Sequence, residues 1–103
     1  MDGPDPRRVH TLAELSRELE LLRARAARGS HKTKVSLAEL ARRVDEPRST
    51  IHAYLTGRYL APADVLDEIV IALGADRAEL PEWGEAWFRV AADQHERMCH
   101  RRS

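Results

Sequence analysis

The sequence predicts an all-α fold, a compact bundle of five helices, and three observations support this prediction. Five segments carry apolar residues at intervals of three and four, which is the spacing of one helix face. Residues that typically begin or end helices flank each segment. The most strand-like stretch, VLDEIVIAL, lies between a proline and a glycine that suit the start and stop of a helix, so no strand is predicted.

The first helix is predicted from about residue 11 to residue 27. Residues 1–10 contain two prolines, a glycine and no apolar periodicity, so we expect a flexible N-terminal arm there. Thr11 and Glu14 then have the spacing of a capping box, in which the two residues satisfy each other's backbone N–H groups. Gly29 ends the helix, and a basic loop follows. The apolar face of this helix consists of Leu12, Leu15, Leu19 and Leu22.

Two short helices follow, at 37–44 and 48–55. Ser36 and Glu39 form a second capping box in front of the first of them. Pro47 cannot continue that helix but suits the first turn of a new one, and Gly57 ends the second helix. The residues expected to face the core are Leu37, Leu40, Ala41, Val44, Ile51 and either Tyr54 or Leu55.

Two further helices complete the predicted bundle. A proline at 62 and an aspartate at 64 begin a fourth helix, which ends at Gly74. After one more turn, Pro81 begins the last helix, which runs to about Met98. We therefore predict one domain over residues 11–98, followed by a basic tail at 99–103.

The composition is that of a soluble globular domain. The 103 residues are one-third charged and contain no run of eighteen apolar residues, which argues against a membrane span. The N-terminus lacks the apolar centre of a secretory signal, so we expect a cytoplasmic protein. Cys99 is the single cysteine, which excludes a disulfide within the chain.

The formal net charge is zero, but the charges are unevenly distributed. Residues 20–60 contain nine Lys or Arg against four acids, whereas residues 61–96 contain two against nine. This asymmetry is suited to orienting a molecule on DNA with its basic half inward and its acidic half available to a protein partner. The alternative is a chance clustering of charges on solvated helix surfaces.

The segment 35–62 is the most informative part of the chain. Ala41 is small enough for two helices to cross closely, and the turn between these helices is short. The second helix would then direct Arg48, Ser49 and His52 outward. A short helix with an exposed polar face is what the major groove of DNA accepts.

These residues resemble the Xre/Cro/cI-type helix-turn-helix family, in the form frequent in actinobacteria. The matching segments are LAELARRV, PRSTIHAYLTGR, the helix between Pro62 and Gly74, and EWGEAW, and the resemblance covers roughly residues 11–92. It implies a lambda-repressor-like DNA-binding domain. Asp45 departs from the family pattern at a turn position that is usually glycine, and Glu46 at one that is usually apolar. Aspartate tolerates the left-handed conformation that such a turn requires.

The resemblance also implies roles for individual residues. Positions that reach base edges are matched by Arg48, Ser49, His52 and Ala53. Ser36 and the backbone N–H of Leu37 match a helix N-terminus that anchors a phosphate. Further backbone contacts are expected from Arg43, Thr50, Tyr54, Arg58, Lys32 and Lys34.

Other residue groups allow more than one interpretation. The last helix carries an aromatic and apolar set that either packs it onto the domain or forms a dimer surface: Trp83, Trp87, Phe88 and Val90. His95, Cys99 and His100 resemble metal ligands, but a fourth ligand is lacking and no metal site is predicted. The sequence has no nucleophile–base set and no glycine-rich phosphate loop, so we predict neither an enzyme nor a cofactor.

The function predicted from these observations is sequence-specific binding of double-stranded DNA by a transcriptional regulator. A homodimer is expected, because one recognition helix reads few base pairs, and such a protein would be associated with the nucleoid. The alternative is a protein-interaction module, antitoxin- or antirepressor-like, that keeps the fold with weak or no DNA binding.

Overall fold

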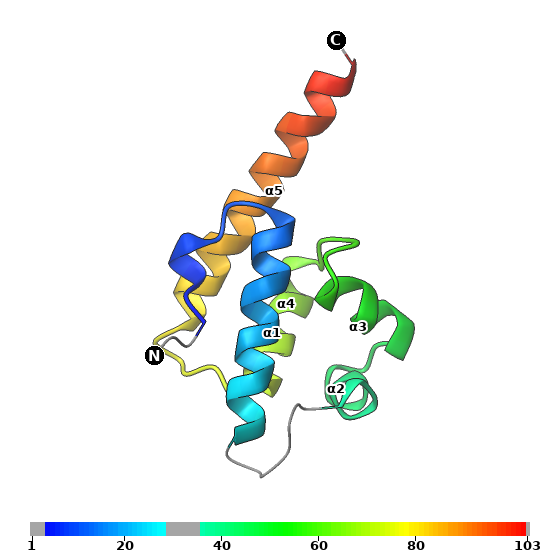
Figure 1. The fold of residues 1–103 in the computed structure, drawn as a ribbon, viewed down its shortest axis with the longest axis vertical. Coiled ribbons are helices and arrows are strands. Elements are labelled where there is room, and N and C mark those ends of the chain that lie inside the picture. Colours follow the sequence, from blue (N-terminus) through cyan, green and yellow to red (C-terminus); the bar gives the residue numbers. More distant parts are fainter. Residues whose placement is uncertain (1–3, 29–35, 103) are drawn as a thin grey trace.

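The computed structural model describes residues 4–28 and 36–102, and all regular elements within these ranges are helical (Figure 1). The predicted all-α fold with five α-helices is confirmed for this part of the chain. A short 3₁₀ helix precedes the five. The elements are η1 (Pro6–Arg8), α1 (Leu12–Arg28), α2 (Leu37–Val44), α3 (Arg48–Leu55), α4 (Ala63–Ala72) and α5 (Leu80–Arg102).

The N-terminus of α1 has both halves of the predicted capping box. The Glu14 backbone N–H donates to Thr11 Oγ1 at 3.2 Å, and the Thr11 N–H donates to Glu14 Oε1 at 3.0 Å. The same carboxylate accepts the His10 N–H at 2.9 Å. These hydrogen bonds, led by the one from His10, hold the pKa of Glu14 below its usual value because they stabilise the ionised form.

One hydrophobic core joins η1 to the five α-helices. Helices α2 and α4 pack against each other, as do α4 and α5, and α1 contacts both α3 and α5. The predicted apolar faces of α1, α2 and α3 point into this core, and Leu55 rather than Tyr54 is the fully buried residue at the end of α3. Among the largest fully buried side chains are Trp83, Leu19, Leu22, Leu40, Ile51 and Leu66.

Residues 4–10, which were predicted to belong to a flexible arm, pack against the helices. Pro6 and Val9 are buried, and η1 packs against α5. The Arg89 guanidinium donates to the carbonyl oxygens of Val9 and Pro6, both at 2.7 Å, and the Asp5 N–H donates to Glu18 at 2.7 Å. The segment is therefore held against both α1 and α5.

Helix α5 reaches Arg102, so residues 99–102 of the predicted basic tail continue the helix. No glycine or proline follows Gly84 to end it. Figure 1 shows its C-terminal half extending past the end of the bundle. Trp83 and Val90 are buried in the core, and the half-buried Trp87 donates from Nε1 to the Ala61 carbonyl at 2.7 Å. Phe88 is 69% exposed and lies edge-on to Trp87.

Candidate nucleic-acid interface

Helices α2 and α3 are joined by a three-residue turn that sets their relative orientation. Ser36 caps α2 by accepting the Glu39 N–H at 3.1 Å. Asp45 ends α2 in the left-handed conformation, with φ of 59° and ψ of 46°. The Glu46 N–H then bonds the Ala41 carbonyl at 3.1 Å, which closes the helix end. Pro47 leads into α3, whose first residue is Arg48.

The two faces of α3 differ in polarity. Ile51 and Leu55 are buried, which fixes the helix on the core. Arg48, Ser49 and His52 are exposed on the opposite side, as predicted from helical periodicity. The remaining side chains near this face, Thr50, Ala53 and Tyr54, are half-buried.

The outer face of α3 borders a surface hollow of about 680 Å³, which we call the α3 hollow. All four residues predicted to read bases line it. Leu37, at the start of α2, and Arg58, just after α3, complete the lining. Residues from three segments thus meet in one concave surface, and the predicted anchor at the α2 N-terminus lies beside the predicted base-reading set: Arg48, Ser49, His52 and Ala53.

A second hollow, of about 440 Å³, lies along the other flank of α3. Three of the predicted phosphate-contacting residues line it: Thr50, Tyr54 and Arg58. Tyr59 also lines it and is 63% exposed. Tyr59 was not among the predicted DNA contacts, although an aromatic residue two positions after the glycine that ends a recognition helix was an available signal.

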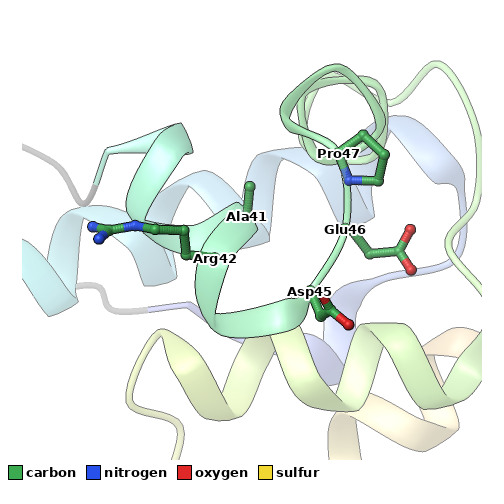
Figure 2. Close-up of a pocket in the computed structure, with 5 residues that line it drawn as sticks. All are labelled: Ala41, Arg42, Asp45, Glu46 and Pro47. Carbon is green, nitrogen blue, oxygen red and sulfur yellow. The ribbon is translucent and has the colours of Figure 1, made fainter.

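The two carboxylates of the turn lie apart from the α3 hollow. Asp45 and Glu46 line a separate hollow of about 400 Å³ with Ala41, Arg42 and Pro47. Figure 2 shows the Arg42 side chain pointing to the opposite side from the Glu46 carboxylate. No residue is shared between the linings of this hollow and of the α3 hollow.

Arg43, which was predicted to contact a phosphate, has two hydrogen-bond partners within the protein. Its guanidinium donates to the Ala72 carbonyl at 3.1 Å and to Glu39 Oε1 at 3.0 Å. It therefore ties α2 to the C-terminal end of α4, where carbonyl groups attract a cation. Lys32 and Lys34, which were also predicted to contact phosphates, lie outside the described residues.

Potential metal ligands do not gather in the described part of the chain. No group of three or more His, Cys, Asp or Glu side chains suited to holding a metal ion occurs there. His95 Nε2 and Cys99 Sγ lie 3.7 Å apart on the surface of α5. The side chain of His100 is outside the described set.

A short capped helix, a three-residue turn with one left-handed residue, and a second helix with an exposed polar face define a helix-turn-helix domain. The family model for the helix-turn-helix domain matches residues 14–83, and the chain belongs to this family. The match runs from the first turn of α1 to the start of α5. No curated protein and no solved structure gave a significant match. None of the described helices is both long and apolar enough to cross a membrane.

Proposed function

We propose that this protein is a sequence-specific double-stranded DNA-binding protein, a bacterial transcriptional regulator of the Xre/Cro/cI type that inserts α3 into the major groove. The observation that carries the proposal is the α3 hollow, in which four exposed or half-exposed side chains of one helix meet Leu37 and Arg58. Action on chromosomal DNA would place the protein in the cytoplasm with the nucleoid.

The side chains around the hollow have the chemistry that base edges require. The guanidinium of Arg48 fits the O6 and N7 atoms of guanine through two parallel hydrogen bonds, worth about 1–3 kcal/mol of discrimination. Ser49 and His52 both donate and accept hydrogen bonds, so they suit several bases. Ala53 presents a methyl group that suits the methyl group of thymine.

Groups at the edges of α3 would hold the duplex in register. The first N–H groups of α2 have no acceptor within their own helix, and the helix dipole makes them favourable for a phosphate. Leu37 places this helix start at the α3 hollow. On the other flank, Thr50, Tyr54 and Arg58 offer hydroxyl groups and a cation to the second phosphate backbone.

The charge distribution supports docking in this orientation. The segment 20–60, which contains α2 and α3, is basic, and the segment 61–96 is acidic. The negatively charged duplex would attract the basic segment and repel the acidic one. Asp45 and Glu46 line a different hollow from Arg48, which reduces their repulsion of a duplex bound at α3.

A homodimer is part of the proposal. A single recognition helix reads few base pairs, whereas two half-sites about 34 Å apart along the duplex multiply affinity and specificity. Helix α5 is the proposed contact, because it carries exposed apolar residues outside the DNA-facing surface.

Exposed acids on α4 favour one second candidate function, an antitoxin- or antirepressor-like protein-interaction module. Asp64, Asp67 and Glu68 are exposed, and Ile71, one turn further on, is 55% exposed. A basic protein partner would suit this face, and such a module would bind DNA weakly or not at all.

Fluorescence anisotropy separates the two functions. Fragments would first be selected from random DNA with the full chain, and binding to selected and random duplexes would then be measured across a salt series. A regulator should prefer the selected duplex, and its affinity should fall steeply with salt because bound phosphates release counterions. Failure to enrich any sequence, with no salt-dependent binding, would reject DNA recognition and favour the protein-interaction module.

A further inference from the structure

The C-terminal half of α5 has one face that no part of the described chain covers. Helix α5 packs on the bundle through Trp83, Ala86 and Val90, all of which are buried. Beyond this stretch the helix continues clear of the bundle (Figure 1), and residues 95–99 are all exposed. Two large apolar side chains of α5 stand out: Phe88, between the buried Ala86 and Val90, is 69% exposed, and Met98, beyond the bundle, is 59% exposed.

These two residues belong to one mainly apolar stripe, which also contains His95. Phe88, Ala91, His95 and Met98 follow each other at spacings of three, four and three, the repeat of a helix that pairs with another helix. The positions beside the stripe, 87, 92, 94 and 99, are also uncharged. The charged residues between 86 and 99 all fall on the other sides of the helix: Arg89, Asp93, Glu96 and Arg97.

We propose that this stripe binds the same stripe of a second copy of the chain, with the two α5 helices antiparallel. The inference deepens the proposed function, because it assigns the surface and the geometry of its homodimer. The surface consists of Phe88, Ala91, Ala92, His95 and Met98, and the two-fold axis crosses between the two helices at the level of residue 93, whose own side chain lies on the far side of the helix.

The order of large and small side chains favours a second copy over an unrelated partner. Phe88 and Met98 are each five residues from position 93. An antiparallel arrangement about this point places each Phe88 against Met98 of the other copy, and an aromatic ring and a thioether form a favourable contact. Between them, Ala91 of one copy lies opposite His95 of the other, so the larger side chain near the centre faces a small one.

A parallel arrangement would lack this fit. Phe88 would face Phe88, and these rings would hold the two bundles apart at the base of the helices, where each ring already lies edge-on to Trp87 at 5.2 Å. The antiparallel segment from Phe88 to Met98 is about 15 Å long. Its contact area is at the low end for a specific complex, so we expect a micromolar dimer that a two-half-site duplex would strengthen.

Analytical ultracentrifugation of the full chain without DNA, in buffer with EDTA, tests the surface. We expect a reversible monomer–dimer equilibrium. Phe88→Ala should weaken it about a hundred-fold, because two symmetric contacts of roughly ten-fold each are lost. Ile71→Ala is the matched control, since Ile71 is a similarly exposed apolar residue on α4, and it should leave the equilibrium unchanged.

Crosslinking tests the geometry through the sole cysteine of the chain. In the proposed arrangement the two Cys99 residues are twelve positions apart along the helix axis, about 18 Å, so a short bis-maleimide should not join them. In a Cys99→Ser background, Ala92→Cys places a thiol beside the two-fold axis and should give a crosslinked dimer. Efficient crosslinking through Cys99 itself would overturn the antiparallel arrangement.

The two proposals fail separately. A wild-type chain that stays monomeric at several hundred micromolar, or equal effects of Phe88→Ala and Ile71→Ala, would overturn the α5 interface while leaving DNA recognition by α3 intact. A dimer that shows no salt-dependent DNA binding would overturn DNA recognition by α3 while leaving the α5 interface intact.

Discussion

The hydroxyl of Ser16 donates a 2.6 Å hydrogen bond to the carbonyl oxygen of Leu55, the last residue of α3. This bond joins two residues 39 positions apart and ties the C-terminal end of the recognition helix to α1. The chain then turns at Gly57, which has a φ of +77°. A Cβ atom at Gly57 would lie 3.2 Å from the Cβ of Ser16. The turn that follows α3 therefore requires a residue without a side chain at position 57.

We predict that Gly57→Ala lowers the free energy of unfolding by about 1–2 kcal/mol, because alanine is strained at positive φ and its methyl group crowds Ser16. Thermal or urea unfolding followed by circular dichroism measures the change. Two alanine substitutions provide controls. Gly74→Ala has the same strain at φ +88° but no crowding, so its loss should be smaller. Gly84→Ala lies in α5 with open space around it and should stabilise by about 0.5–1 kcal/mol. An effect of Gly57→Ala no larger than that of Gly74→Ala would show that contact with Ser16 is unimportant.

Arg25 and Glu79 predict a pH dependence of stability. Their side chains form a two-fold hydrogen-bonded ion pair, with NH1–Oε1 at 2.9 Å and NH2–Oε2 at 3.0 Å. The Arg25 guanidinium, together with the Asp76 N–H, lowers the pKa of Glu79 below its usual 4.5. A lowered folded-state pKa means that the stabilisation is present above pH 4.5 and is lost as pH falls through the folded-state pKa.

Glu79→Gln should therefore destabilise the protein by about 1 kcal/mol at pH 7, a modest value because solvent partly screens the pair. The difference from the wild type should shrink toward zero as the pH falls below 4.5 and through the lowered folded-state pKa of Glu79. Urea unfolding at a series of pH values measures it. Asp93→Asn removes the exposed pair with Arg97 along α5 and should change stability by only a few tenths of a kcal/mol. A Glu79→Gln deficit that does not shrink as the pH falls below 4.5 would contradict the ionic origin of the effect.

Features with local causes could be predicted from the sequence. The starts of α2 and α3 follow from Ser36 and Pro47, and the left-handed conformation of Asp45 follows from its place in the turn. The grouping of Arg48 with His52 around one hollow follows from helical periodicity alone.

Features that depend on distant segments could not be predicted. Burial of Val9 relies on Arg89, 80 residues away, so a segment without periodicity looked like a free arm. The Ala72 carbonyl that Arg43 binds is 29 residues further along the chain, so this hydrogen bond could not be predicted from the sequence around Arg43. Tyr59 lines the second hollow together with Pro62 and with residues of α3.

Arg48→Ala should weaken binding to a selected duplex by about 5- to 150-fold, corresponding to the loss of 1–3 kcal/mol of base discrimination. Binding to random DNA should change much less, because that binding depends mainly on phosphates. Anisotropy on both duplexes measures the two effects. Arg42→Ala is the control, since Arg42 is exposed on α2 but lines the hollow of Asp45 and Glu46 instead. Equal losses on selected and random DNA would remove Arg48 from the base-reading set.

Arg58 and Arg43 should differ in their effect on the salt dependence of binding. Arg58 is exposed and lines both hollows beside α3, where no carboxylate is part of either lining. Arg58→Ala should weaken binding to all duplexes similarly and reduce the slope of log K against log salt by about 0.9, the value for one phosphate contact. Arg43 already binds the Ala72 carbonyl and Glu39, so Arg43→Ala should leave the slope unchanged and lower only the thermal stability. Salt titrations of both variants against the wild type give the comparison. A reduced slope for Arg43→Ala would mean that its guanidinium leaves α4 to bind a phosphate. An unchanged slope for Arg58→Ala would mean that neither hollow receives the DNA backbone at this residue.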